Sequence, residues 1–233
     1  MAKIVDSKLI REEVFGDKKK VYCYELEVTN INNQKKVFTF FSRKPKDKTA
    51  YMKNGNSMPD VVEVMVIAVD KLGKEHFVLL DQYRPTVGCR LVEFPAGKID
   101  PGMTPKEQIV LEMKQETGLS ITEKNIVNIL PRGFKSAGIT DEDCVFGTVK
   151  ISYEELARAR QELEGFEDIN VNVIPVEKGK GYIQDKFVTN TVAVGVSFYA
   201  DYYLQKLENA ELKKEIETLK KQVAKDGVSE LGK

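Results

Sequence analysis

The sequence has no excess of charge of either sign, because 36 lysine and arginine residues balance 36 aspartate and glutamate residues. A domain that binds nucleic acid is expected to be basic, so this balance argues against a nucleic-acid partner. The chain also lacks an apolar run of transmembrane length, and we expect no membrane association. Residues 1–6 lack the long apolar core of a signal peptide, so the expected location is cytoplasmic.

Cysteine and histidine are scarce as well, which argues against several kinds of catalytic chemistry. Cys23, Cys89 and Cys144 are odd in number and scattered, a pattern that suggests neither a disulfide framework nor a zinc site. His76 is the single histidine and lies in a strand-like stretch, where a structural role is expected. Catalysis by a serine–histidine or cysteine–histidine pair would therefore rest on that one residue.

The residues that are present suffice for a folded core. Hydrophobic residues make up 42% of the 233 residues, enough for one large domain or for a domain with a small appendage. Lys44–Pro59 is polar and carries proline and glycine, so it is predicted to be a linker. Short runs rich in β-branched and aromatic residues predict strands elsewhere. These runs are Val21–Val28, Lys36–Phe41, Val61–Val69, Phe77–Gln82, Asn125–Leu130, Cys144–Ile151 and Ile169–Val176.

The stretch from Phe94 to Leu119 contains the clearest helix signal in the chain. Thr104 stands where an N-cap hydroxyl is expected, and Pro105 suits the first helical position because its missing N–H has no partner there. Gly118 is a typical C-terminal stop. The sequence therefore predicts a helix from about residue 105 to residue 117.

Two carboxylates on this helix point to a metal site. Glu112 and Glu116 are four residues apart, so they lie together on one face, while Ile109, Val110 and Met113 form an apolar stripe on another. Adjacent like charges repel slightly, which is tolerable on a solvated surface and useful if a divalent cation lies between them. Mg²⁺ prefers oxygen ligands and is typically held by one or two carboxylates plus substrate phosphates.

The same segment resembles a Nudix box, G-x5-E-x7-R-E-U-x-E-E-x-G-U with U aliphatic, the signature of Mg²⁺-dependent hydrolases of nucleoside diphosphates linked to another moiety. Three positions depart from the pattern: Met103 replaces the first glutamate, Leu111 the arginine and Gln115 the second-last glutamate. A contact between Met103 and Leu111 could replace an ion pair of the family, whereas Gln115 removes a negative charge beside the implied metal. The matching positions are Gly97, Glu112, Glu116, Gly118 and Leu119.

The flanking segments make the resemblance more specific. Gln82–Pro85, Glu93–Gly97 and Ser136–Glu142 resemble the ADP-ribose pyrophosphatase branch of the family, and the similarity extends from about residue 21 to residue 207. The branch usually has proline where this chain has Ala137, a position that bears on substrate choice.

The resemblance implies an α+β fold, a Nudix-type α/β/α sandwich with a mixed sheet and an added N-terminal antiparallel sheet. Residues 1–58 would form this dimerisation sheet and a linker, residues 59–207 the Nudix domain, and residues 208–233 a charged helical extension and tail. The implied activity is Mg²⁺-dependent hydrolysis of the pyrophosphate bond of ADP-ribose or a related nucleoside diphosphate sugar, with Mn²⁺ as the alternative ion. The alternative function is that of a catalytically impaired Nudix-fold module with a ligand-binding or regulatory role. A third possible function is that of a scaffold protein assembled through the C-terminal helix.

Site residues follow from the same resemblance. Glu112, Glu116 and the Ala96 carbonyl would hold the metal, with Gln115 as a weaker ligand through its amide oxygen. Glu167, or next Glu164, would orient or deprotonate the attacking water. For each of these two glutamates, a solvated acidic turn is the alternative.

The predicted substrate contacts lie outside the box. Arg84 would clamp the diphosphate with its planar fork or form a structural bridge to Glu93, and the two roles can coexist. Glu93 is also a candidate for a water-mediated metal contact. The N-terminal sheet would be exchanged in a homodimer and supply Phe38 and Arg43 to the adenine and phosphate site. Alternatively, the aromatic residues around Phe38 simply alternate between the core and a partner surface.

The C-terminal region is predicted to be helical. Phe187–Leu207 should be an amphipathic helix that closes the domain, and residues 226–233 should be disordered. Between these two segments, an apolar stripe at coiled-coil spacing covers only about two heptads. This short length favours a solvated helical extension, or a helix packed on the parent dimer, over a coiled coil that assembles by itself. Its apolar residues are Leu212, Ile216, Leu219 and Val223.

Overall fold

The structure, a computed structural model, describes residues 4–16, 20–55, 58–163 and 165–230, and for residues 224–230 it describes only the backbone. The chain forms two compact units, and strands β4 and β10 and helix α1 each begin in the first and end in the second. Unit 1 comprises residues 1–64, 96–113 and 121–149, and unit 2 comprises residues 65–95, 114–120 and 150–233.

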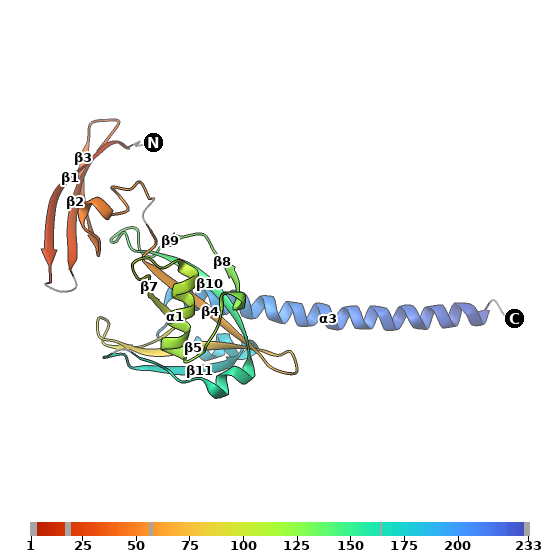
Figure 1. Ribbon diagram of the computed structural model, residues 1–233. Coiled ribbons are helices and arrows are strands. Elements are labelled where there is room, and N and C mark those ends of the chain that lie inside the picture. Colours follow the sequence, from red (N-terminus) through yellow and green to blue (C-terminus); the bar gives the residue numbers. More distant parts are fainter. Residues whose placement is uncertain (1–3, 17–19, 56–57, 164, 231–233) are drawn as a thin grey trace. The chain divides into compact units, whose positions relative to one another are not determined.

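The N-terminal part of unit 1 is a three-stranded antiparallel sheet, drawn in red and orange in Figure 1. Its strands are β1 (Ile4–Phe15), β2 (Val21–Asn30) and β3 (Lys35–Ser42), in the order β1-β2-β3. The turn between β2 and β3 places Asn33 in the left-handed region with φ 57°, which asparagine tolerates well. The strands predicted at Val21–Val28 and Lys36–Phe41 are confirmed, and they pair as an antiparallel hairpin.

The remaining strands of unit 1 belong to a second sheet, in which β4 and β10 are neighbours. The start of β4 pairs with β7 so that Glu63 lies opposite Ala96, and β10 pairs with both β8 and β9. The predicted linker is not freely solvated throughout, because the Ala50 N–H donates to Asp141 Oδ2 at 2.9 Å. The elements are η1 (Lys46–Lys48), β4 (Val61–Val69), β7 (Ala96–Lys98), α1 (Pro105–Thr117), η2 (Glu123–Asn125), β8 (Ile126–Ile129), β9 (Gly133–Phe134) and β10 (Asp143–Ser152).

Strand β5 is the centre of unit 2. One edge pairs with β11 along its length, and the other pairs first with the end of β4 and then with β6, all antiparallel. Phe77 and Leu79 of β5 are fully buried, and a Cβ at Gly179 would lie 2.7 Å from the Phe77 ring. Other elements of unit 2 are β5 (Glu75–Arg84), β6 (Cys89–Glu93), η3 (Tyr153–Arg158), β11 (Ile169–Pro175), η4 (Val176–Lys178), α2 (Gly179–Ile183) and α3 (Asn190–Glu230).

Helix α1 begins and ends where local signals predicted. The Thr104 N–H donates to Glu107 Oε2 at 2.8 Å and the Glu107 N–H donates to Thr104 Oγ1 at 3.3 Å, which forms a capping box. Gly118 has φ +74° and donates its N–H to the Lys114 carbonyl at 3.0 Å. The helix is held by its apolar stripe, in which Ile109 and Met113 are fully buried.

Helix α3 has 41 residues and only its first part is packed (Figure 1). Val192, Val196 and Ala200 recur every four residues and are buried, whereas every side chain from Leu204 to Val223 is exposed. The prediction of disorder from residue 226 was wrong through residue 230, where the backbone remains helical. These residues continue a helix whose preceding part is rich in the strong helix formers lysine, glutamate and alanine, and no proline interrupts it; residues 231–233 lie outside the described part. No helix in the described ranges is both long enough and apolar enough to cross a membrane.

Candidate active site

In unit 1 the Glu112 carboxylate is buried against the loop that precedes α1. Glu112 is only 8% exposed, and a Cβ added at Gly97 would lie 1.7 Å from Glu112 Oε1. A side chain at position 97 would therefore displace the Glu112 carboxylate, so glycine is favoured there by close approach rather than by backbone torsion. The predicted pairing of Gly97 and Glu112 in one motif thus has a direct physical basis.

Gln108 holds this carboxylate and was missed by the sequence reasoning. Its Nε2 donates to Glu112 Oε1 at 2.8 Å, while its Oε1 accepts from the Asp100 N–H at 2.9 Å. Gln108 is 2% exposed, so the two bonds tie the loop to the carboxylate inside the unit. The spacing of four residues to Glu112 on a helix was the signal that could have found it.

The Ala96 end of β7 lies opposite a buried charge on β4. Ala96 pairs with Glu63, which is 2% exposed and forms an ion pair with Lys135. Burial by itself would lower the pKa of Lys135, but the Glu63 carboxylate outweighs this effect and the pKa is raised. Burial also raises the pKa of the nearby Cys144 thiol to about 11, so this cysteine is protonated at neutral pH.

In unit 2 the C-terminal turn of α1 is covered by residues 160–162. The Glu162 N–H donates to the Gln115 carbonyl at 2.8 Å, and Gln161 Nε2 donates to the Glu116 carbonyl at 2.6 Å. The Glu116 residue is 4% exposed, and Gln115 is half-buried. Glu116 is therefore not on a solvated face, and the contacts to residues 160–162 fix the backbone that carries it.

Of the two predicted water-activating glutamates, Glu167 is half-buried and follows the turn at Gly165 in unit 2. Glu164 lies outside the described residues. Asp168, next to Glu167, accepts from Arg90 Nη1 at 2.7 Å, which anchors the start of β11 to β6. The acidic segment is thus attached to the strands of unit 2 at its end.

Arg84 and Glu93 form the bridge that was one of the two predicted roles for Arg84. Arg84 Nε and Nη2 donate to the same oxygen, Glu93 Oε2, at 2.8 and 2.7 Å. The Glu93 side chain is 9% exposed and that of Arg84 is 40% exposed. The carboxylate therefore holds the guanidinium from the protein side, while part of the guanidinium remains accessible.

Phe38 and Arg43 line two different cavities of unit 1. Phe38 lies on a cavity of about 570 Å³ together with Phe40, Tyr51 and Phe134. Arg43 lies on a second cavity of about 700 Å³, and its Nε is 3.4 Å from Glu142 Oε2. The structure does not bring these two predicted substrate contacts into one cavity.

The oxygen donors of α1 suit a hard cation completed by substrate. No group of three or more histidine, cysteine or acidic side chains that could hold a metal occurs among the described residues. The donors present are instead the carboxylates of Glu112 and Glu116, one helical turn apart, the neutral amide oxygen of Gln115 and the backbone carbonyl of Ala96. Mg²⁺ commonly takes one or two carboxylates and fills its octahedron with phosphate oxygens and water, so the chemistry of these donors suits it.

Comparisons with known proteins identify relatives that are named ADP-ribose pyrophosphatase or Nudix hydrolase. No protein-family model matches the chain. It is 30% identical over 158 residues to the ADP-ribose pyrophosphatase of Saccharomyces cerevisiae, covering 63% of this chain and 67% of that protein. It is 32% identical over 123 residues to the putative Nudix hydrolase 2 of Caenorhabditis elegans, covering 52% of this chain and 54% of that protein. The chain thus spans about half the length of the C. elegans relative.

A further relative and a solved structure agree with these matches. The ADP-ribose pyrophosphatase of Bacillus subtilis is 29% identical over 152 residues, which is 65% of this chain and 76% of that protein. A crystal structure described as an ADP compounds hydrolase superposes with a TM-score of 0.60 at 15% identity, covering 88% of this chain and 97% of that chain. At that identity the likeness shows the fold alone, and it confirms the predicted α+β class with a mixed sheet.

Proposed function

Because the chain belongs to the Nudix hydrolase family, we propose that it hydrolyses the pyrophosphate bond of ADP-ribose or a related nucleoside diphosphate sugar. Two relatives at about 30% identity carry the name ADP-ribose pyrophosphatase, which supports this substrate class. The observation that carries the proposal is the buried Glu112 carboxylate, packed on Gly97 and held by Gln108.

The proposed cation is Mg²⁺, held by Glu112, Glu116, the Ala96 carbonyl and, more weakly, the Gln115 amide oxygen. A cation bound there would supply Lewis-acid chemistry, activating water and offsetting the charge that develops on the phosphoryl oxygens. The hydrogen bond from Gln108 fixes the orientation of the Glu112 carboxylate, so little rearrangement is needed when a cation and a diphosphate arrive. The contacts of residues 160–162 fix the Glu116 backbone in the same way.

Arg84 is proposed to clamp the diphosphate. A planar guanidinium can donate two parallel hydrogen bonds to phosphate oxygens, and Glu93 holds it in place through its Nε and Nη2 atoms. This arrangement makes Glu93 a positioning residue that acts through Arg84. Truncating Glu93 should therefore raise KM for the diphosphate through the released guanidinium.

Glu167, with Glu164 as the next candidate, is proposed to orient or deprotonate the attacking water. Phe38 is proposed to receive the adenine ring, because the cavity that it lines presents several aromatic rings on which a base can stack. Arg43 is proposed as a phosphate contact. The N-terminal sheet is proposed to form a homodimer, since it exposes apolar side chains that include Val14, Phe15 and Phe41.

Gln115 keeps the second candidate function open. A ligand-binding or regulatory module with the same fold would retain the pocket and lose turnover, and the missing charge at Gln115 favours that loss. The test is to mix the purified chain with Mg²⁺ and a panel of nucleoside diphosphate sugars and to follow AMP release. The proposal expects release that depends on Mg²⁺ and disappears in Glu116→Gln, whereas tight binding of ADP-ribose without AMP release would favour the module.

A further inference from the structure

The second cavity of unit 1 has a lining rich in basic side chains. Its volume is about 700 Å³, within the range of typical ligand pockets. Apolar residues such as Met58, Val61 and Ile99 form part of the wall, and no aromatic ring lines it in the part of the chain that the structure describes. Its charged lining residues are Arg43, Lys44, Lys48, Lys53, Lys98, Asp60 and Glu142.

The cavity carries positive charge in a chain that is neutral overall. Five cationic and two anionic described side chains line it, a formal excess of three positive charges, whereas the whole chain has a formal net charge of +0. Like charges gathered around a concave surface repel one another, and a bound anion relieves that repulsion. Concave walls also focus the field, so the cavity should attract anions more strongly than the same lysines spread over a flat surface.

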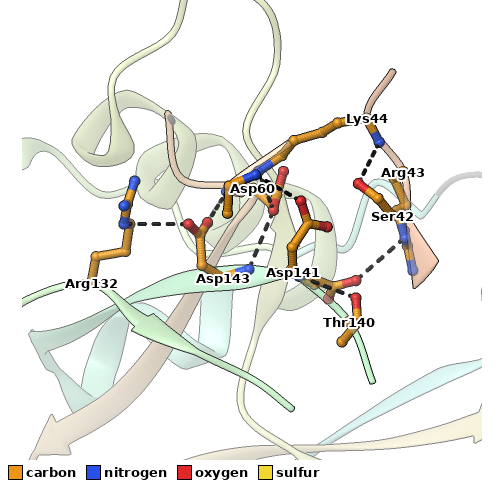
Figure 2. A network of polar contacts seen from close by, with 10 residues as sticks. Ser42, Arg43, Lys44, Asp60, Arg132, Thr140, Asp141 and Asp143 are labelled. Carbon is orange, nitrogen blue, oxygen red and sulfur yellow. Dashed lines mark hydrogen bonds and ion pairs between the residues drawn. The ribbon is translucent and has the colours of Figure 1, made fainter. Parts of the chain in front are cut away.

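Lys44, one of these cations, is held in position by a network of polar contacts (Figure 2). Lys44 Nζ lies 2.8 Å from Asp60 Oδ2, and both side chains are less than one-fifth exposed. Asp60 is fixed in turn by Asp143, since the Asp60 N–H donates to Asp143 Oδ1 at 2.8 Å and the Asp143 N–H donates to Asp60 Oδ2 at 3.2 Å. Arg132 Nε then lies 3.3 Å from Asp143 Oδ2. The Lys44 ammonium is therefore preorganised at the cavity wall.

We propose that this cavity is a binding site for a phosphate group that is additional to the hydrolysed diphosphate. Lysine ammonium groups bind phosphate as point charges, and Lys48, Lys53 and Lys98 line this cavity. The absence of rings from the described lining separates this cavity from the one that contains Phe38, which suits a base. The ligand is thus a phosphate dianion or phosphate monoester, and it needs no stacking surface.

The site adjoins the proposed metal-binding strand within unit 1. Lys98 and Ala96 lie two residues apart on β7, so their side chains point to the same face, and Val61 of β4 pairs with Lys98. A phosphate here has two sources: an extra phosphate on the substrate itself, or a free phosphate that binds beside the substrate. The site stands on the geometry of unit 1, and only the distinction between the two sources rests on the proposed function.

The first experiment measures binding without turnover. The full chain is titrated with inorganic phosphate in the calorimeter at low ionic strength and without divalent cations. The test variant is Lys48→Gln combined with Lys53→Gln, and the matched control is Lys46→Gln, which changes an exposed lysine of the same η1 turn that does not line the cavity. We expect saturable binding by the wild type and the control, and about a tenfold loss in the double variant from losing charge-assisted hydrogen bonds. Equal affinity of wild type and double variant, or no saturable binding, overturns the site.

The second experiment distinguishes the sources by hydrolysis kinetics. Wild type and the double variant are compared on ADP-ribose and on ADP-ribose that carries a further phosphate on a ribose hydroxyl. A lower KM for the phosphorylated substrate in the wild type only, with kcat unchanged, identifies the substrate's own phosphate. A change in ADP-ribose hydrolysis on adding inorganic phosphate, again in the wild type only, identifies the free ion. If no substrate is hydrolysed, the proposed function fails, while the calorimetric result still decides the site. Turnover without either effect overturns both sources, and with them the link between this site and hydrolysis.

Discussion

Substituting Gly97 with alanine tests the contact on which the proposed metal site depends. The new Cβ would lie 1.7 Å from Glu112 Oε1 and 1.9 Å from Glu112 Cδ, whereas ordinary contact begins at 3.4 Å. The carboxylate or the loop must therefore shift by about 1.7 Å, and a misplacement of about 1 Å in a catalytic site can cost roughly 100-fold in rate. We expect Gly97→Ala to lower kcat by about 100-fold and to raise the Mg²⁺ concentration needed for half-maximal rate.

The assay is AMP release from ADP-ribose at saturating substrate over a range of Mg²⁺ concentrations, with thermal unfolding measured in parallel. Gly133→Ala is the matched control, because it also lies in unit 1 and a Cβ there has nothing within 4 Å. The control should keep both kcat and the Mg²⁺ requirement. If Gly97→Ala keeps them too, the contact with Glu112 is not part of the catalytic machinery and the reasoning is refuted.

A second variant covers the outcome in which Gly97→Ala does not fold. Gln108→Leu keeps a similar volume but removes the donor to Glu112 Oε1, a charge-assisted hydrogen bond whose loss costs about 1.5–3 kcal/mol. Because the carboxylate keeps its place against Gly97 but loses the hydrogen bond that orients it, we expect a smaller rise in the Mg²⁺ requirement than for Gly97→Ala. An unchanged Mg²⁺ requirement in a folded Gln108→Leu protein would remove Gln108 as a positioning residue.

Other predictions address the remaining features. Gln115→Glu should lower the Mg²⁺ requirement, because it adds a negative charge beside Glu116. Glu116→Gln should abolish turnover, a loss on the order of several kcal/mol of transition-state stabilisation. If wild type and Gln115→Glu both bind ADP-ribose but release no AMP, the binding module is favoured. Light scattering should give about twice 26.4 kDa, the mass of a dimer, and a monomer would contradict this prediction. Truncation after Leu207 should leave the dimer intact, because the side chains beyond it are exposed through residue 223. Loss of the dimer on truncation would contradict that expectation. Burial acts to raise the pKa of Glu75, but the bonds from Tyr199 and Lys150 outweigh it and the pKa is lowered from 4.5, so its stabilisation should be present above that pH and lost as pH falls further. Glu75→Gln should therefore lower the free energy of unfolding by roughly 1–3 kcal/mol at pH 7 and by less in acid, and an equal loss at both pH values would contradict the assignment.

Local signals determined the elements whose ends depend on neighbouring residues. Helix α1 could be placed from Thr104, Pro105 and Gly118 because capping and left-handed glycine act within one turn of the chain. The strands of the β2–β3 hairpin followed from strand-like runs in the sequence, because such runs are also local. The family resemblance was equally local, since the residues that carried it are contiguous in short segments. The predicted domain boundaries and site roles stay predictions.

Tertiary structure decided the surroundings of the site. Glu112 and Glu116 were considered compatible with a solvated face, yet they are 8% and 4% exposed, because other segments of the chain pack over α1. The partners Glu63 and Lys135 are 72 residues apart in sequence, so no local pattern pairs them. The basic cavity likewise draws on segments around residues 43, 60, 98 and 142, and its charge excess exists only where folding brings them together. Spacing along the chain fixes neighbours within an element, whereas burial and long-range pairing depend on how the elements pack.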